Sequence, residues 1–274
     1  MCHDLSFSAS TVEFITDLLP SIIFDHQMDL DFTITSHVLS MSHRKCLVIY
    51  SRDGSPHLNS FEWGLIADFM KTPELIKKYR IQMANARSEN VLDKKSAWYR
   101  FKNNRCLVAV DGIYEHRTIE GWKTKVPYYI KLKENKHLLL PAFYNYASLP
   151  NLETGEMKGT FSVVTRPANT LMKMIHNAGT NKHRMPLFMQ PQQSLQWINE
   201  SNTDKQLKEL MQYEIPAEQL EAWPVFSIRS TKPRPDHKEK YEPFNYEKLP
   251  ALGNDEPSQE IQGSLFVNFN QEIK

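Results

Sequence analysis

Short runs of alternating hydrophobic and polar residues recur along most of the chain and predict β-strands separated by polar turns. The region 32–66 alternates such runs with turns and includes a strand at 46–51. From residue 107 onward the strand pattern returns. The segments 127–133 and 137–146 are predicted to form a strand pair, and further strands are expected at 160–165 and 222–228.

Helical periodicity is confined to short segments. Ser10 and Thr11 precede an amphipathic stretch that Pro20 ends, so a capped helix is expected there. Further helices are expected at 75–80, 192–199 and 204–213, and at 167–176 with proline in the first turn. Because strands do not alternate with long helices, a doubly wound parallel sheet is disfavoured. The pattern predicts an α+β fold built on a curved, barrel-like, mostly antiparallel sheet with flanking short helices.

The composition changes near the end of the chain. Residues 229–241 are basic and interrupted by proline, and residues 253–260 are polar and acidic. We therefore predict one folded domain over residues 1–245 and a C-terminal tail over residues 246–274.

The overall composition narrows the class of protein. With 274 residues, 41% hydrophobic and 24% charged, the chain has the composition of a globular protein. A net charge of +1 argues against a highly basic protein that coats nucleic acid, although it allows a local basic groove. We find no secretory signal, and no apolar stretch reaches the roughly 18 residues of a membrane span. A cytoplasmic, nucleoid-associated location without a membrane partner is expected.

Cysteine supplies the most informative position. Cys46 and Cys106 lie in strand-like runs and are expected to be buried, and the three cysteines form neither a disulfide framework nor a metal motif. Cys2 is different, because removal of Met1 would place an amine and a thiol on the same Cα. Such a 1,2-aminothiol condenses with an aldehyde to a Schiff base, which the thiol closes into a thiazolidine ring. The amine has an ordinary pKa of about 8 and the thiol of about 8.5, so both can react near neutrality.

Four further segments concentrate polar and aromatic groups. They are Phe61-Glu62-Trp63-Gly64-Leu65-Ile66, Asn85-Ala86-Arg87-Ser88-Glu89, Asp111-Gly112-Ile113-Tyr114-Glu115-His116, and Ile175-His176-Asn177 followed by His183-Arg184-Met185-Pro186. Each segment is commonplace alone. Their order after an N-terminal Met-Cys, over residues 2–230, strongly resembles the SRAP (SOS response-associated peptidase) family, whose members covalently trap abasic sites in single-stranded DNA.

The resemblance implies a fold, an activity and a set of catalytic residues. It implies an SRAP-like fold and a protein of the DNA-damage (SOS) response that forms a thiazolidine cross-link between Cys2 and an abasic site. Glu115 would be the acid/base for ring opening and imine formation, and Asn85 would hold the amine or the sugar. His176 would act on the sugar hydroxyl and on a lyase-like reversal. No cofactor and no metal are implied.

The same resemblance implies contacts with DNA. Arg87 would bind a flanking phosphate. Trp63, Phe69 and Met70 lie near positions where the family uses side chains to wedge or stack bases, and Thr165 and Arg184 match backbone contacts. Binding of an unstacked strand should tolerate sequence changes and weaken with salt.

The chain also departs from the family pattern. His3 and Asp4 follow the nucleophile where a basic residue is common, so Asp4 would either weaken phosphate contact or pair with Arg87. Ala67 replaces a common proline and His116 a common tryptophan. The histidine assignment has two solutions: anchoring on Ile175 selects His176, which we favour, whereas anchoring on Arg-Met-Pro selects His183.

The tail contains a further motif. Gln262, Leu265 and Phe266 resemble the short peptide by which bacterial proteins dock on the replication sliding clamp, and such a peptide would fold on binding. The alternative is that these apolar residues pack back on the domain.

Two other functions remain compatible with the sequence. An N-terminal cysteine with a histidine base also suits a thiol peptidase (hydrolase), and removal of Met1 would then be autoproteolytic. The third possibility is a non-catalytic adaptor that binds DNA or the clamp.

Overall fold

A closed, five-stranded barrel forms the centre of the computed structural model, which describes residues 2–8, 10–25, 36–150, 155–230 and 233–255. Its strands are β4 (Lys45–Arg52), β5 (Ser55–Trp63), β7 (Arg105–Val110), β10 (Leu138–Pro150) and β11 (Met157–Pro167). Neighbouring strands are antiparallel except β5 and β11, whose parallel pairing closes the barrel. Three short strands extend this sheet: β2 (Ile23–Phe24), β6 (Asn85–Arg87) and β12 (Arg184–Pro186).

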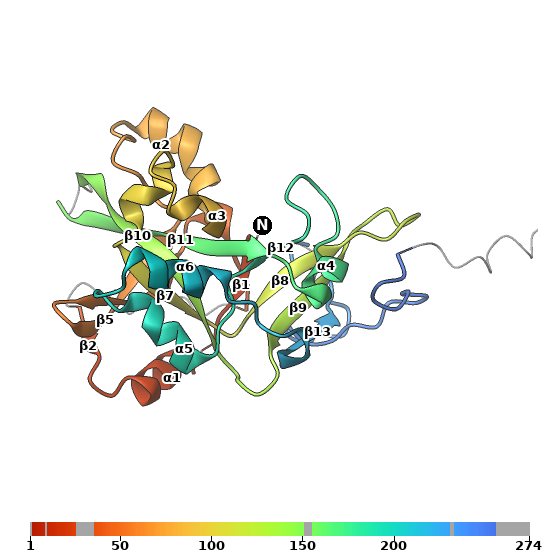
Figure 1. The fold of residues 1–274 in the computed structure, drawn as a ribbon. Helices are drawn as coiled ribbons and strands as arrows, with labels where there is room; N and C mark the ends of the chain where they lie inside the picture. Colours follow the sequence, from red (N-terminus) through yellow and green to blue (C-terminus); the bar gives the residue numbers. More distant parts are fainter. Residues whose placement is uncertain (1, 9, 26–35, 151–154, 231–232, 256–274) are drawn as a thin grey trace, which may run out of the picture.

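A second sheet lies beside the barrel (Figure 1). It has five antiparallel strands in the order β13-β9-β8-β1-β3. Their bounds are β1 (Asp4–Ser6), β3 (Val38–Leu39), β8 (Gly112–Arg117), β9 (Val126–Leu132) and β13 (Leu220–Pro224). The chain passes from barrel to second sheet at Asp111, between β7 and β8. Gly112 is required there, because a Cβ would lie 2.5 Å from the ring of Tyr129.

Short helices flank the two sheets. They are α1 (Thr11–Leu18), α2 (Pro73–Tyr79), α3 (Ser88–Val91), α4 (Thr170–Ile175), α5 (Pro191–Ser194) and α6 (Asp204–Gln212). Single 3-10 turns are η1 (Ser40–Ser42), η2 (Arg80–Met83), η3 (Ala97–Phe101), η4 (Leu195–Ile198) and η5 (Ala217–Gln219). Thr203 and Gln206 form a capping box that fixes the start of α6. Among the described residues, no helix has the length and hydropathy needed to cross a bilayer.

Alternation along the strands divides the core. In β4, Cys46 and Val48 join the cluster shared by the barrel and the second sheet, whereas Leu47 and Ile49 join the cluster beneath the helices. This period of two explains why the strand runs were predictable from the sequence. The structure confirms the expected α+β class and its barrel-like sheet.

Three details differ from the sequence-based expectation. The segments 127–133 and 137–146 are strands but do not pair: β9 pairs with β8 and β13, and β10 pairs with β7 and β11. Pro167 ends β11, and α4 begins at Thr170 after the cap of Asn169. Ser10 precedes α1 without capping it, because its hydroxyl contacts Ser8.

The domain also continues past residue 245. Leu249 and Leu252 pack against the main hydrophobic cluster, and Arg117 donates hydrogen bonds to backbone carbonyls at 250, 251 and 254. Residues 246–255 therefore belong to the folded domain, and the boundary lies beyond the predicted position.

Candidate functional site

Cys2 lies just before β1, in the hydrophobic cluster shared by the two sheets. β1 is held between β3 and β8, with Asp4 opposite Tyr114, so the start of the chain is fixed in the middle of the molecule (Figure 1). The Cys2 side chain is fully buried. Burial first, and then the negative charges of Glu115 and Asp4, raise the pKa of the Cys2 thiol well above its usual value.

Asn85 connects β6 to the start of the chain. β6 runs parallel to β11, with Asn85 opposite Val163. Its side-chain Nδ2 donates a hydrogen bond of 2.8 Å to the backbone carbonyl of Cys2. Its Oδ1 is buried and has no hydrogen-bond partner among the described residues. Asn85 therefore fixes Cys2 and keeps one acceptor for another group.

Glu115 points from β8 into the same interior and is 5% exposed. Its Oε1 is also buried without a hydrogen-bond partner in the described part of the chain. Burial raises the pKa of Glu115 to about 8, so the carboxyl is largely protonated at neutral pH. A carboxyl with such a pKa can give up its proton near neutrality.

The two candidate histidines have different environments. His176 caps the end of α4, is 9% exposed, and its Nδ1 lies 2.8 Å from the carbonyl oxygen of Arg184. A carbonyl only accepts, so Nδ1 carries the proton and Nε2 is the basic nitrogen of the neutral ring. Burial lowers the pKa of His176 to about 4. His183 is exposed with a positive φ of 61°. The buried neighbourhood of α4 and β8 thus favours His176.

The strand β11 lies between β6, which carries Asn85, and β12, which orients His176. Asn85 lies beside one edge of this strand, and β12, whose Arg184 carbonyl orients His176, lies beside the other. Ile175 and Cys2 belong to the same hydrophobic cluster. The arrangement combines a buried carboxyl, an amide and an imidazole around the first residues of the chain.

Asp4 does not pair with Arg87. Its carboxylate accepts hydrogen bonds from Arg229 Nε at 3.1 Å and Nη2 at 2.5 Å, and it contacts His37 Nε2 at 2.7 Å. Burial opposes ionisation, but these hydrogen bonds lower the pKa of Asp4. Of the two alternatives for Asp4, pairing with Arg87 is the one that the structure contradicts, because Arg87 instead donates to Asn181 Oδ1 at 2.7 Å. His3 contacts Ser40 Oγ at 2.7 Å.

Three of the predicted DNA contacts are core residues. Trp63 is fully buried, stacks on Phe161 and donates to the carbonyl of Ala84. Met70 and Thr165 are also fully buried. All three side chains belong to the core of this structure, as the side chain of Cys2 does, and a DNA contact by any of them stays a prediction.

The other predicted contacts keep polar or exposed surface. Phe69 is 46% exposed and Arg87 is exposed. Arg184 is largely buried and makes two hydrogen bonds to the carboxylate of Glu89, at 2.7 and 2.9 Å. Its Nη2 also donates to the carbonyl of Thr165. A DNA contact by Arg184 stays a prediction. The clamp-like residues Gln262, Leu265 and Phe266 lie outside the described residues.

Sequence reasoning missed the residues that support the site from a distance. Arg229 neutralises Asp4 across 225 positions, and Asn177 bonds to the backbone of Thr118, three residues after Glu115. A signal for Asn177 was present, since it directly follows His176 in the quoted motif. Arg229 gave no comparable signal.

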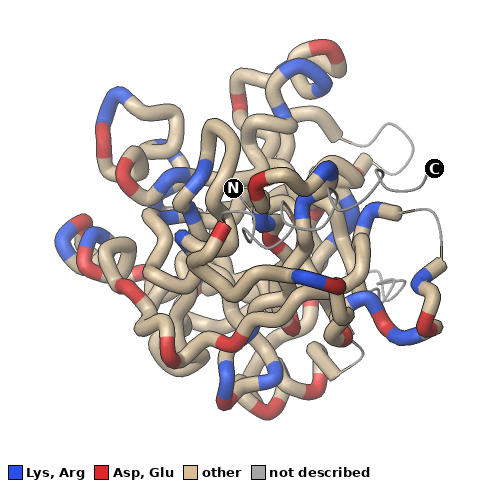
Figure 2. The backbone as a smooth tube through the Cα atoms, turned by 90° about the vertical axis from the view of Figure 1, so that its right-hand side faces the viewer, with Lys and Arg blue, Asp and Glu red and all other residues tan. Residues whose placement is uncertain are grey.

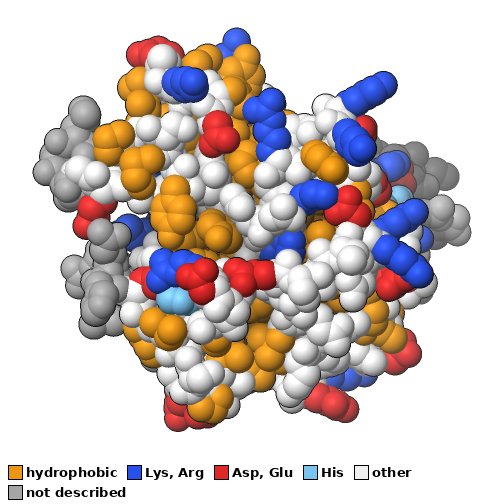
Figure 3. All heavy atoms as spheres, turned by 60° about the vertical axis from the view of Figure 1, so that its left-hand side comes forward, with side chains coloured by type: hydrophobic (Ala, Val, Ile, Leu, Met, Phe, Trp, Pro, Cys, Tyr) orange, Lys and Arg blue, Asp and Glu red, His pale blue; other side chains and the backbone are white. Residues whose placement is uncertain are grey.

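Charges of both signs are interspersed over the backbone (Figure 2), and hydrophobic side chains gather in patches between them on the face shown in Figure 3. One groove of about 460 Å³ combines aromatic and basic residues, among them Phe69, Tyr99, Arg100, Lys94 and Lys95. None of the proposed catalytic side chains lines this groove.

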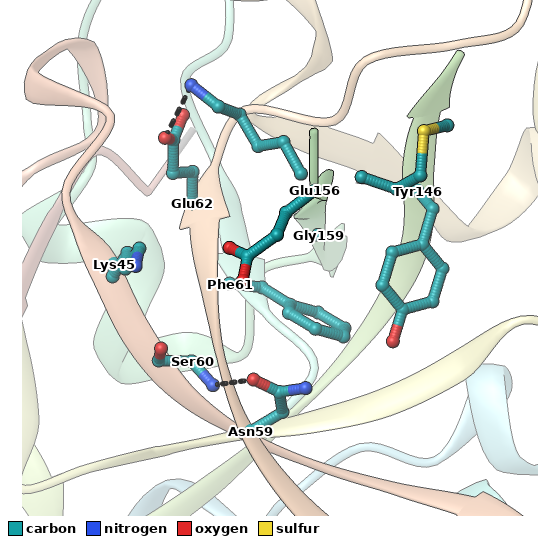
Figure 4. A pocket seen from close by; sticks show the side chains of 10 residues that line it. Lys45, Asn59, Ser60, Phe61, Glu62, Tyr146, Glu156 and Gly159 are labelled. Atoms are coloured by element: carbon teal, nitrogen blue, oxygen red, sulfur yellow. Dashed lines mark hydrogen bonds and ion pairs between the residues drawn. The ribbon is translucent and has the colours of Figure 1, made fainter. Parts of the chain in front are cut away.

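A smaller cavity, of about 140 Å³, lies between β5 and the hairpin of β10 and β11 (Figure 4). Phe61 fills the space left by Gly159, where a Cβ would lie 2.2 Å from its ring. Glu62 pairs with Lys158 at 2.8 Å along its wall. None of the proposed catalytic side chains lines this cavity, so it is separate from the site around Cys2.

Comparison with known proteins gives relatives of similar sequence. The chain is 29% identical over 182 residues to "Abasic site processing protein YoqW" of Bacillus subtilis, covering 66% of this chain and 75% of the relative. It is 26% identical to "Abasic site processing protein YedK" of Escherichia coli, covering 66% and 73%. The corresponding "HMCES" of Gallus gallus is 26% identical, covering 64% and 56%.

Solved structures and a family model agree with these relatives. A crystal structure of a Bacteroides thetaiotaomicron protein superposes with a TM-score of 0.69 at 26% identity, covering 88% of this chain and 97% of the other. The family model described as SOS response associated peptidase (SRAP) matches residues 10–228. The chain therefore belongs to the SRAP family.

Proposed function

We propose that this chain processes abasic sites in DNA by capturing them covalently through Cys2, as a thiazolidine cross-link in single-stranded DNA. The observation that supports the proposal is a pair of buried oxygens near the start of the chain, Asn85 Oδ1 and Glu115 Oε1, that have no hydrogen-bond partner among the described residues. Buried polar atoms normally have partners, so two such atoms in one site favour a ligand that supplies donors. The names of the relatives support an abasic site as that ligand.

The covalent chemistry begins with the loss of Met1, which converts the amide nitrogen of Cys2 into an amine. This amine attacks the open-chain aldehyde of the abasic sugar, and one water leaves as the imine forms. The thiol sulfur then adds to the imine carbon and its proton goes to the nitrogen, which closes the thiazolidine. The adduct thus contains protein plus DNA minus one water.

Asn85 and Glu115 would orient and protonate the reacting atoms. The hydrogen bond from Asn85 to the Cys2 carbonyl fixes the backbone that carries both nucleophiles. Glu115, protonated at neutral pH, would donate to the departing oxygen during ring opening and loss of water.

His176 would accept protons at Nε2, since its Nδ1–H is engaged by the Arg184 carbonyl. Burial lowers the pKa of His176 to about 4 and keeps the ring neutral over the physiological range, so Nε2 would act as an acceptor toward a sugar hydroxyl. Reversal requires the same transfers in the opposite direction, so His176 would act in reversal as well.

The buried thiol favours this chemistry over a thiol peptidase. An activated peptidase cysteine has a lowered pKa, whereas burial raises the pKa of Cys2. In a thiazolidine the amine reacts first, and ring closure by the thiol is intramolecular, which reduces the need for a preformed thiolate.

The DNA strand would follow the groove of Phe69, Tyr99, Arg100, Lys94 and Lys95, with Arg87 binding a phosphate. Stacking on an exposed ring contributes about 1–3 kcal/mol per base and tolerates any sequence. In this role the protein would protect abasic sites during the DNA-damage response, in a nucleoid-associated setting. The clamp-like peptide would bring it to replication sites.

The test is incubation of the mature protein with a single-stranded oligonucleotide that contains one abasic site, followed by a denaturing gel. We expect a shifted band that survives heating and is absent for Cys2→Ala. Cys46→Ala is the matched control, because Cys46 is equally buried but lies in β4. Non-covalent binding without a shifted band would favour the adaptor alternative and overturn the proposal.

A further inference from the structure

The end of the described chain, residues 249–255, forms a strap that contacts the last residue of β8 and the helix α4. Leu249 and Leu252 pack on the main cluster. Gly253 has a φ of +89°, and a Cβ there would lie 3.1 Å from the sulfur of Met174 in α4. A residue without Cβ thus allows the strap to contact the helix that carries His176 at its end.

Arg117 anchors the strap to the strand of Glu115, two residues away. Its guanidinium is fully buried and donates five hydrogen bonds, one for each of its N–H groups. The acceptors are Asp255 Oδ1, Tyr128 Oη and the carbonyl oxygens of Pro250, Ala251 and Asn254, at 2.7 to 3.2 Å.

The Asp255 carboxylate bonds both to β8 and to the segment that follows α4. Its Oδ1 accepts from Arg117 Nε at 2.7 Å, and its Oδ2 accepts from Asn177 Nδ2 at 3.0 Å. Asn177 follows His176 and also makes a reciprocal pair of hydrogen bonds with the backbone of Thr118, at 2.9 and 2.8 Å. The carboxylate therefore joins the residue after His176 to the strand that carries Glu115.

We propose that Asp255 is a positioning residue of the active site, which holds Glu115 and His176 in register through Arg117 and Asn177. This inference rests on the proposed function for its effect on DNA, but the positioning itself is a property of the free protein. The strap is thus a working part of the site, although it follows the residues 10–228 that match the family model.

The test compares Asp255→Ala and Asp255→Asn with Glu247→Gln, an exposed carboxylate eight residues earlier. A second pair of variants ends the chain after Lys248 or after Asp255, so that only the first loses the strap. Rates of cross-link formation and reversal are measured in single turnover on the abasic oligonucleotide. The titration of the His176 imidazole is followed by NMR in the free protein.

We expect Asp255→Ala and the chain ending at Lys248 to slow formation and reversal about tenfold and to move the His176 titration toward that of an exposed imidazole. Asp255→Asn should restore part of both, because the amide keeps the size and one acceptor. Glu247→Gln and the chain ending at Asp255 should match the wild type within twofold. Thermal unfolding verifies that each variant is folded at the temperature used.

An unchanged His176 titration in folded Asp255→Ala overturns the positioning role, whatever the rates. A shifted titration with unchanged rates would also contradict the inference, because the contact would then serve the fold alone. If the wild type forms no cross-link, the proposed function fails, and the NMR titration still decides whether Asp255 positions His176.

Discussion

Glu115 and Asp25 are carboxyl groups in polar clusters of the two different sheets, and their surroundings are opposite. Asp25, next to β2, accepts hydrogen bonds from Tyr50 at 2.5 Å and Asn59 at 2.8 Å, and it contacts His57 at 2.8 Å. Although burial opposes it, these hydrogen bonds lower the pKa of Asp25. No group in the described part of the chain bonds to Glu115 Oε1, and burial raises the pKa of Glu115 to about 8.

The two environments suit different roles, one in stabilising the fold and one in the reaction. A carboxylate whose lone pairs are all engaged contributes to the fold and has nothing left for a substrate. A buried carboxyl with an open oxygen lacks that stabilisation and keeps a proton near neutral pH. The comparison therefore assigns Glu115 to the reaction and Asp25 to the structure, although both appear in the sequence as single acidic residues among strand residues.

The largest difference in cross-linking rate is expected between a substitution near Glu115 and a substitution near Asp25. Cys2→Ala, or retention of Met1 before Cys2, should reduce cross-linking to background, because either change removes the aminothiol. Tyr50→Phe should leave the cross-linking rate within twofold, since it alters only the cluster of Asp25. Gel quantification of the shifted band measures both, and a Cys2→Ala variant that still cross-links would place the nucleophile elsewhere.

The two carboxyl groups themselves give the next contrast. Glu115→Gln should slow cross-link formation by about 10²-fold or more, as expected when an acid/base is lost. Asp25→Asn should leave the rate unchanged and lower the free energy of unfolding by about 1–3 kcal/mol, because its donors lose a charged acceptor. Single-turnover kinetics and chemical denaturation measure the two effects, and the reverse outcome would exchange the roles.

The dependence on pH sharpens the assignment of Glu115. If its protonated form donates during ring opening, the rate of formation should fall about tenfold per pH unit above pH 8. This decrease in rate above pH 8 should be absent in Glu115→Gln and present in Asp25→Asn. A rate that instead rises through pH 8 in the wild type would identify the carboxylate as a base.

The smallest expected effect is on stability against pH. The folded-state pKa of Glu115 is raised above its unfolded value of 4.5, so its contribution is fully present below pH 4.5 and is lost as the pH rises to about 8. The melting temperature of the wild type should therefore fall relative to Glu115→Gln across this window. Calorimetry of both proteins from pH 4 to 9 measures the difference, and parallel curves would contradict the raised pKa.

The sequence predicted individual strands well but their partners poorly. The alternation in β4 and β11 requires only local information, and these strands lie where expected. The segments 127–133 and 137–146 suggested a hairpin because only a short turn separates them. Each segment pairs instead with its neighbour on the other side in sequence, β9 with β8 and β10 with β11, and their second partners, β13 and β7, occupy the remaining edges.

The site was predicted unevenly for a similar reason. Cys2, Asn85, Glu115 and His176 could be proposed from motif order. All four are buried, Asn85 bonds to the Cys2 carbonyl, and Glu115 acts on the Cys2 thiol, but their catalytic roles stay a proposal. Burial cannot be judged from residue type, so Trp63 and Met70 were assigned to DNA although they form the core. The Asp4–Arg229 pair joins residues that no local pattern relates.

The most direct test of the central claim is the intact mass of the adduct between the mature protein and an abasic single-stranded oligonucleotide, with peptide mapping of the attachment point. The account predicts the mass of protein without Met1 plus DNA minus one water, with both the nitrogen and the sulfur of Cys2 bonded to the sugar carbon. An adduct attached at another residue, or a protein that retains Met1 and still forms the adduct, would contradict it.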